Sequence, residues 1–196
     1  MKIALATTNQ GKIREIREIL DMPDVSWMTV NDCDEWPVIE ETGMTFRANA
    51  EIKAAAVAAR FNLPALADDS GLEVDALGGL PGINSARFAG DGATDADNLS
   101  KLVGELRARG LDRSPARFVS EVVIVWPDGR KVEARGVCDG EVIASPRGGG
   151  GFGYDPVFVP DGFDQTMAEL EPGAKNRLSH RGQALRGLKE FLDIDD

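Results

Sequence analysis

The chain has 196 residues, which suits one domain with a full hydrophobic core. Its hydrophobic fraction of 42% and charged fraction of 28% are ordinary for a globular protein. The net charge of −11, from 22 basic and 33 acidic residues, repels polyanions and argues against binding to nucleic acid or to an anionic membrane. No stretch approaches the roughly 18 uninterrupted apolar residues of a membrane span, and the short apolar start predicts a first strand rather than a signal peptide.

The cysteine and histidine content limits the redox and metal chemistry. Cys33 and Cys138 are far apart and outside any C-x-x-C pair, which argues against a disulfide framework and a zinc site and favours the reducing cytoplasm. His180 is the only histidine. A metal would therefore rest on carboxylates and water, which points to a hard cation such as magnesium.

The N-terminal segment predicts a strand followed by a helix. Residues 3–6 form an apolar run, and apolar residues then recur at helical spacing over residues 13–20, with Glu15 and other charged residues on the opposite face. Between them, the polar residues 7–12 form a strand-to-helix turn, a place where α/β proteins hold phosphates on helix N-terminal amides. An ordinary turn with Lys12 on the surface is the alternative, and this segment alone favours it.

The next segments predict a second helix and a second strand. An alanine-rich helix is expected over residues 46–60, with Asn49 and Lys53 four apart on one of its faces. Residues 63–67 form an apolar run that predicts a strand. We expect this strand to end in residues 68–71, where Ser70 and Gly71 make a tight turn open to a ligand.

The remaining segments complete a mixed α/β pattern. Thr94 is expected to cap a third helix, and residues 118–126 and 131–137 predict a hairpin. A short strand at residues 157–159 and a last helix from near Ser179 follow. This order of elements predicts a mixed sheet, with a ligand in a cleft between two lobes.

Two pairs of adjacent carboxylates are candidates for a metal site. Asp68 and Asp69 follow an apolar strand, where two neighbouring carboxylates cost free energy unless a cation lies near them. Glu40 and Glu41 form the second pair. One carboxylate from each pair would give a two-ligand magnesium site completed by water and phosphate oxygens. The alternative is that these are solvated acidic pairs, which suits Glu40 and Glu41 better than Asp68 and Asp69.

The tract over residues 148–156 combines four consecutive glycines with two aromatic rings and a carboxylate. Glycines allow close backbone approach to a ligand and turn N–H groups toward an anion, and a flexible linker would not continue with such residues. The tract also matches G-x-G-x-x-G, but Pro156 forbids the helix that a dinucleotide-binding motif requires. A glycine hinge is the alternative.

A cationic cluster begins the last predicted helix, where Lys175, Ser179, His180 and Arg181 lie close together in the sequence. Cationic groups at a helix N-terminus oppose the helix dipole. They therefore cost stability unless they serve an anion or the edge of a base. In a chain of net charge −11, this placement favours a functional role.

Taken together, these segments resemble one family, the inosine triphosphate pyrophosphatases, which act on non-canonical purine nucleoside triphosphates. Six stretches match the family in its order, namely residues 6–12, 40–43, 67–72, 78–82 and 151–156, and Lys175 with residues 179–185. They span nearly the whole chain, and six in register are highly specific. Thr8 and Gly149 stand where the family often has glycine and threonine, which leaves the reaction class unchanged.

The resemblance implies the fold, the reaction and the site. It implies an elongated mixed α/β sheet in two lobes with flanking helices and a central nucleotide-binding cleft, residues 1–196 as a single domain, and a homodimer. It implies Mg²⁺-dependent hydrolysis of ITP, dITP and XTP to the monophosphate and pyrophosphate, with Glu40 and Asp69 as metal ligands and Asp69 as general base. The residues that it implies for nucleotide binding are Thr7, Thr8, Asn9, Gln10, Gly11, Lys12, Lys53, Ser70, Phe152, Gly153, Tyr154, Asp155, Lys175, His180 and Arg181.

Selection of the base is expected to depend on the purine 6-position. Hypoxanthine and xanthine carry an acceptor oxygen there, whereas adenine carries a donor. Donors from Arg181, His180 or nearby backbone would match the first and oppose the second, a mismatch that can discriminate by about four orders of magnitude.

Two other classes of protein remain open from the sequence. One is a pyrophosphatase with a different base preference, or a triphosphatase that releases orthophosphate. The other is a non-catalytic nucleotide sensor, against which Lys12, Glu40 and Asp69 argue.

Overall fold

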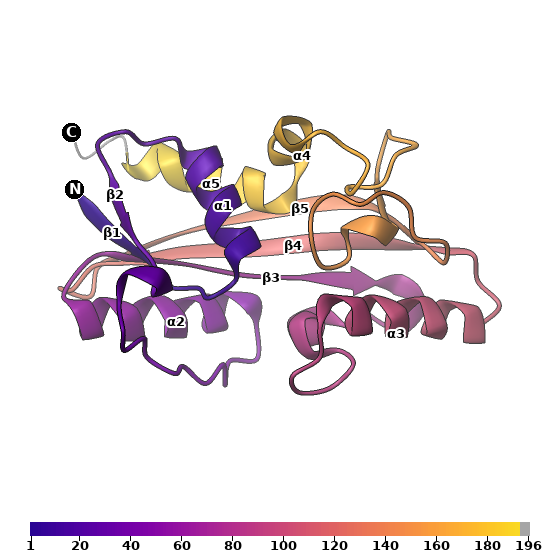
Figure 1. Ribbon diagram of the computed structural model, residues 1–196, viewed down its shortest axis with the longest axis horizontal. Coiled ribbons are helices and arrows are strands. Elements are labelled where there is room, and N and C mark those ends of the chain that lie inside the picture. Colours follow the sequence, from indigo (N-terminus) through magenta and orange to yellow (C-terminus); the bar gives the residue numbers. More distant parts are fainter. Residues whose placement is uncertain (193–196) are drawn as a thin grey trace. The chain divides into compact units, whose positions relative to one another are not determined.

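The computed structural model describes residues 1–192 of the chain (Figure 1). Its strands are β1 Lys2–Leu5, β2 Ser26–Met28, β3 Ala65–Val74, β4 Arg113–Val125, β5 Lys131–Ile143 and β6 Phe158–Pro160. Its α-helices are α1 Gln10–Leu20, α2 Phe46–Phe61, α3 Asp95–Ala108, α4 Pro172–Leu178 and α5 His180–Leu192. None of the helices within residues 1–192 is long and apolar enough to cross a membrane.

The strands form one six-stranded sheet in the order β2-β1-β3-β4-β5-β6. Strand β1 runs parallel to both β2 and β3, whereas β6 runs antiparallel to β5. The parallel pairs come from the N-terminal β-α-β segment, since a parallel neighbour requires a crossover connection. The predicted mixed α/β fold with flanking helices is confirmed.

The chain divides into two compact units. Unit 1 comprises residues 1–69, 120–136 and 181–196, and unit 2 comprises residues 70–119 and 137–180. Strands β3, β4 and β5 each contribute residues to both units. The single-domain assignment and the central cleft remain predictions.

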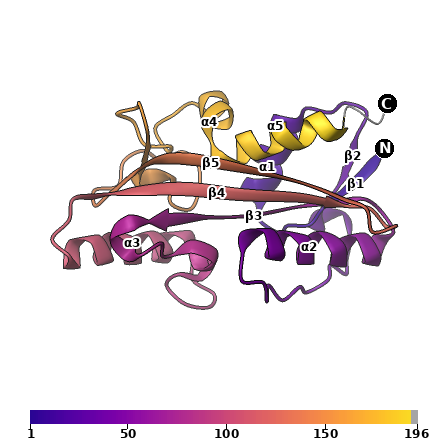
Figure 2. The ribbon, with the colours of Figure 1, turned by 180° about the vertical axis from the view of Figure 1, so that it is seen from behind.

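In unit 1, the sheet is buried on both faces, and its side chains alternate between two different cores. Ile3, Leu5 and Leu66 pack with apolar residues of α1 and α5. Ala4 and Ala67 pack on the other face with the alanine-rich helix α2. Figure 1 shows α1 and α5 on one side of these strands and α2 on the other, and Figure 2 shows the same layers from behind. Small residues on the α2 face let that helix approach the sheet closely, which explains its alanine content.

Unit 2 has a separate core. Leu102 and Leu106 of α3 pack with Leu72 and Val74 from the end of β3, and with Phe158 at the start of β6. Helix α3 begins as predicted at Thr94, whose side chain accepts from the backbone of Asp97 in a capping box.

The sequence interpretation was wrong about the end of β3. The predicted strand end at residues 68–71, with its turn at Ser70 and Gly71, is a continuous part of the strand, which runs from Ala65 to Val74 with Asp68 and Asp69 both buried. Ion pairs stabilise these carboxylates inside the sheet, so polarity does not end the strand here. Strand β2 and helix α4 were not predicted, because each is short: three and seven residues.

Candidate active site

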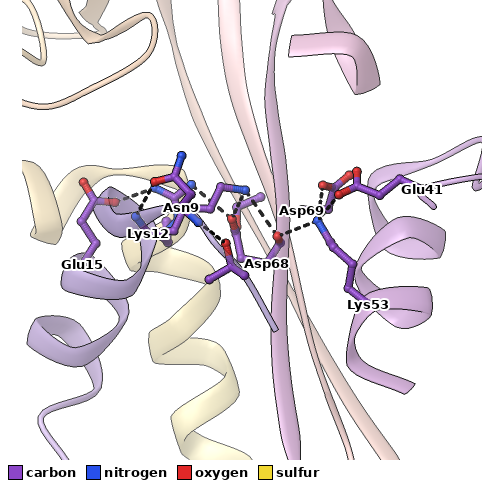
Figure 3. A network of polar contacts seen from close by, with 10 residues as sticks. Asn9, Lys12, Glu15, Glu41, Lys53, Asp68 and Asp69 are labelled. Atoms are coloured by element: carbon purple, nitrogen blue, oxygen red, sulfur yellow. Dashed lines mark hydrogen bonds and ion pairs between the residues drawn. The ribbon is translucent and has the colours of Figure 1, made fainter. Parts of the chain in front are cut away.

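The candidate site is built around two adjacent carboxylates in the middle of β3. Successive side chains of a strand point to opposite faces of the sheet. Asp68 therefore shares the face of Leu66, toward α1 and α5, whereas Asp69 shares the face of Ala67, toward α2. Figure 3 shows Lys12 and Lys53 reaching these two residues from opposite sides of the strand. The two carboxylates do not need a shared cation, because the strand separates them.

Asp68 is fully buried and surrounded by hydrogen-bond donors. Its Oδ2 lies 2.6 Å from Lys12 Nζ and 3.2 Å from Arg181 Nη2, and its Oδ1 accepts a 2.5 Å hydrogen bond from Ser120. Arg181 Nη1 in turn contacts Glu15 at 2.5 Å. The result is a buried network in which one carboxylate positions the ammonium of Lys12.

The electrostatics of this network favour an ionised Asp68. Burial raises the pKa of Asp68, but the charges of Arg181 and Lys12 outweigh it and hold the pKa well below its usual value. Burial lowers the pKa of Lys12, opposed by Asp68. Burial also disfavours the charged form of Arg181, yet Asp68 and Glu15 raise its pKa further.

Asp69 is paired on the opposite face with Lys53 of α2. Lys53 Nζ lies 2.6 Å from Asp69 Oδ1, 3.2 Å from Glu41 Oε1 and 3.1 Å from the carbonyl oxygen of Asp68. Burial raises the pKa of Asp69, and Lys53 opposes this shift. Burial lowers the pKa of Lys53, but Asp69 and Glu41 outweigh it and raise the pKa. These contacts favour an ionised carboxylate and a protonated amine.

The second acidic pair contributes one residue to this group. The carboxylate of Glu41 reaches Lys53, whereas Glu40 is exposed and its carbonyl oxygen accepts a hydrogen bond from Thr42 N. Asp69 and Glu41 thus direct carboxylate oxygens at one cationic centre. Hard oxygen donors of this kind suit Mg²⁺, which takes one or two carboxylates with water and phosphate oxygens. The donor set therefore fits a divalent cation, with Glu41 a better-placed partner for Asp69 than Glu40.

The turn before α1 has the predicted strand-to-helix geometry. Asn9 is the N-cap, and its Oδ1 accepts from Lys12 N at 3.0 Å. Thr7 Oγ1 accepts from Asn9 N at 3.2 Å, and Gln10 contacts the backbone of Thr8 at 3.4 Å. The N–H groups in the first turn of α1, which includes Gly11, therefore point out of the N-terminal end of the helix. Lys12 lies at the same end. This arrangement suits an anion.

A second group of predicted residues comes together within unit 2. Asp155 Oδ2 accepts hydrogen bonds from Lys175 Nζ at 2.5 Å and from Phe152 N at 2.8 Å. The ammonium of Lys175 lies 4.8 Å from the centre of the Phe152 ring, in cation–π contact. Lys175 belongs to α4, not to the start of α5. The group offers an aromatic face beside a buried ion pair.

The glycine tract was expected to turn its N–H groups toward an anion, but some of these N–H groups donate to acceptors within the protein. Gly150 N donates to Ala168 O at 3.0 Å, and Gly153 N donates to Asp95 Oδ2 at 2.9 Å. A Cβ at Gly151 would collide with Asp155. Gly148, Gly150 and Gly151 therefore serve close packing, whereas Gly149 and Gly153 have open space beside them.

The other predicted residues are held by backbone and ring contacts. Tyr154 is buried, and its hydroxyl donates to Ser85 O at 2.8 Å. The buried ring of His180 stacks on Phe118, with centroids 4.6 Å apart and planes 9° apart. Ser70 follows Asp69 on β3 and is half-buried.

Sequence reasoning missed Glu15, Ser120 and Asp95. Glu15 was placed on the solvent face of α1, but it is buried against Arg181. Its partner lies 166 residues away, so no local pattern reveals the contact. Ser120 is a polar residue within an apolar strand, and this interruption was the one local sign of a buried polar partner, here Asp68. Asp95 lies in the first turn of α3, and its contact with Gly153 joins residues that are 58 positions apart.

Comparisons with known proteins identify the family of the chain. A family model described as the Ham1 family matches residues 3–191. The chain belongs to the Ham1 family. A protein of Geobacter sulfurreducens named dITP/XTP pyrophosphatase is 45% identical over 191 residues, covering 97% of this chain and 96% of the relative. A protein of Halalkalibacterium halodurans with the same name is 45% identical, covering 96% and 97%.

Solved structures of the Ham1 family have the same fold. The HAM1 protein of Coxiella burnetii is 40% identical with a TM-score of 0.88, over 99% of both chains. The Ham1 protein of Staphylococcus aureus is 39% identical with a TM-score of 0.86, over 100% of both chains. The predicted family is confirmed, and with it the predicted class, a pyrophosphatase enzyme.

Proposed function

We propose that this protein hydrolyses non-canonical purine nucleoside triphosphates, namely ITP, dITP and XTP, to the monophosphate and pyrophosphate. The observation that carries the proposal is the convergence of two lysines on one peptide. Lys12 Nζ and Lys53 Nζ both contact the carbonyl oxygen of Asp68, at 3.3 and 3.1 Å, beside the carboxylate of Asp69. Such a group combines cations for phosphate oxygens with a base for water. The names of the Ham1 relatives support this substrate class.

The reaction needs a base, a nucleophilic water and a stabilised leaving group. Asp69 takes a proton from water, and the water oxygen bonds to the α-phosphorus. The bond from the α-phosphorus to the bridging oxygen breaks, and its electron pair leaves with pyrophosphate. Lys12 and the first-turn amides of α1 neutralise charge on the phosphate oxygens, together with the proposed contacts of Thr7, Thr8, Asn9, Gln10 and Gly11.

Asp69 and Glu41 are the residues that would hold Mg²⁺, and Glu40 remains the alternative ligand from the sequence. When bound, the cation supplies further neutralisation of the phosphate oxygens. Asp68 keeps Lys12 charged and in place. Lys53 supplies the second ammonium.

We assign Phe152, Asp155 and Lys175 to base recognition, since they combine a ring face with a donor and an acceptor. Gly153 and Tyr154 shape this group, and Ser70, His180 and Arg181 are further proposed nucleotide contacts. Removal of such nucleotides would cleanse the nucleotide pool in the cytoplasm. A homodimer is proposed from the resemblance, and sedimentation measures it.

A panel of (d)NTPs with separate detection of pyrophosphate and orthophosphate tests the reaction. We expect pyrophosphate from ITP, dITP and XTP and little from ATP. Asp69→Asn should lower kcat by two or more orders of magnitude with the fold intact, the typical cost of losing a general base or an electrostatic group. Orthophosphate as product, activity confined to pyrimidines, or binding without turnover would each contradict the proposal.

A further inference from the structure

Lys53 occupies an unusual position for a residue expected to bind phosphate. Its ammonium lies between two carboxylates from different segments, 2.6 Å from Asp69 and 3.2 Å from Glu41 (Figure 3). The side chains of Lys53, Asp69 and Glu41 are only 11%, 10% and 30% exposed. Lys53 is therefore the counter-ion of the two carboxylates that the proposed function assigns to the metal.

Both carboxylates are held by rigid parts of unit 1. Asp69 is in the middle of β3. The segment that carries Glu41 is fixed to α2, because Gly43 N donates to Asn49 Oδ1 at 2.8 Å and a Cβ at Gly43 would lie 2.6 Å from that oxygen. The carboxylates thus converge on the ammonium from fixed backbone, and the flexible partner is the four-carbon side chain of Lys53.

We propose that Lys53 is a resident counter-ion that a divalent cation must displace from Asp69 and Glu41. This inference rests on the proposed function. A cation of charge +2 meets strong repulsion from Lys53 at the same two oxygens, and from Lys12 on the neighbouring carbonyl oxygen. A triphosphate removes this obstacle, since its oxygens accept the displaced ammonium and ligate the cation. The protein therefore takes up metal together with nucleotide and binds free metal weakly.

The test measures metal binding without nucleotide, so that turnover is not the readout. Mn²⁺ replaces Mg²⁺, and its free fraction is followed by electron paramagnetic resonance. Lys53→Met removes the charge and keeps an unbranched side chain of similar length, and we expect it to bind Mn²⁺ at least tenfold more tightly than the wild type. Lys131→Met is the matched control, because Lys131 makes a surface ion pair with Glu51 at 2.7 Å, and its affinity should equal that of the wild type.

Equal or weaker Mn²⁺ binding by Lys53→Met overturns the inference. If that variant does not fold, the wild type supplies a second measurement, acetylation of lysines by acetic anhydride followed by mass spectrometry. Saturating Mn²⁺ should increase modification of Lys53 and leave Lys131 unchanged, and an unchanged Lys53 overturns the inference. Pyrophosphate release by the wild type is measured separately. Its absence overturns the proposed function, whereas unaltered metal affinity with normal turnover overturns only this inference.

Discussion

At the scale of residues, the pair Asp68 and Asp69 shows how one strand gives two adjacent carboxylates different surroundings. Asp68 is fully buried and accepts from Lys12, Arg181 and Ser120. Asp69 lies on the other face with Lys53. Although burial opposes it, Arg181 and Lys12 hold the pKa of Asp68 below its usual value, whereas burial raises the pKa of Asp69 against the effect of Lys53. We therefore infer that Asp68 anchors the phosphate-binding lysine, while Asp69 performs the chemistry.

Asp68→Asn should destabilise the protein more than Asp69→Asn. Removing the charge of Asp68 takes this carboxylate partner from the buried cations of Lys12 and Arg181. Breaking a buried ion pair in this way typically costs about 3–5 kcal/mol. Urea unfolding at pH 7 measures the free energy of unfolding of both variants. Equal stabilities would contradict the anchoring role.

The difference in unfolding free energy between the wild type and Asp68→Asn should depend on pH. Although burial opposes it, Arg181 and Lys12 depress the folded-state pKa of Asp68 below its ordinary value of 3.8. The carboxylate therefore adds stability above the unfolded-state pKa, and this stability is lost as the pH falls through the folded-state pKa. The gap in unfolding free energy between wild type and Asp68→Asn should be widest near neutral pH and narrow below pH 3.8. A gap independent of pH would refute this assignment.

The ion pairs of Arg181 lead to a different hypothesis from the base reader that the sequence suggested. Its Nη1 and Nη2 contact Glu15 and Asp68, and its side chain is 3% exposed. Arg181→Ala should therefore lower kcat/KM for ITP and ATP by similar factors, because it disturbs Asp68 and Lys12 rather than the base. Kinetics with both substrates measure this. A fall confined to ITP would restore the base-reading role.

At the scale of elements, the glycine tract is a packed segment that carries Phe152 and Asp155. Gly151 has a φ of +71° and no room for a Cβ beside Asp155, whereas Gly149 has open space. The carboxylate of Asp155 closes the segment by accepting from Phe152 N and Lys175. Neighbouring glycines in one tract are therefore under different constraints.

Gly151→Ala should raise KM for ITP at least tenfold, because the new methyl group displaces Asp155 from Lys175 and Phe152. Gly149→Ala is the matched control, and its KM should stay within about twofold of the wild type, as is usual for open surface positions. Steady-state kinetics and melting temperatures of both variants are compared. Two unchanged KM values would favour the hinge interpretation.

At the scale of the whole molecule, the two units share three strands. Strands β3, β4 and β5 pass from one unit into the other without a break, and each unit has its own core. When one core unfolds, each of these strands frays at the boundary, and this weakens its hydrogen-bonded pairing in the other core. The units are therefore expected to unfold together, as a single domain would.

Unfolding should give one transition with probes from either unit. Trp27, Trp36 and Trp126 all belong to unit 1, whereas the buried Cys138 belongs to unit 2. In a Cys33→Ser variant, tryptophan fluorescence and the reactivity of the Cys138 thiol should share one denaturant midpoint. Two separate midpoints would mean that the units are independent domains.

The amino-acid sequence by itself determined the family, the mixed α/β class and most of the elements. The helix at residues 46–60 and the cap at Thr94 were predictable because apolar spacing and capping are local properties of the chain. The motifs at residues 6–12, 67–72 and 151–156 were recognisable because each is defined by residues that are consecutive in the chain.

Tertiary structure alone decided which partners these residues have. The strand continues through Asp68 and Asp69, because ion pairs from α1, α2 and α5 stabilise carboxylates that a local pattern assigns to a turn. Glu15 and Arg181 meet across 166 residues, and Glu41 rather than Glu40 reaches Lys53. Contacts of this kind depend on how the helices pack on the sheet, and the spacing of residues along one chain carries no record of that packing.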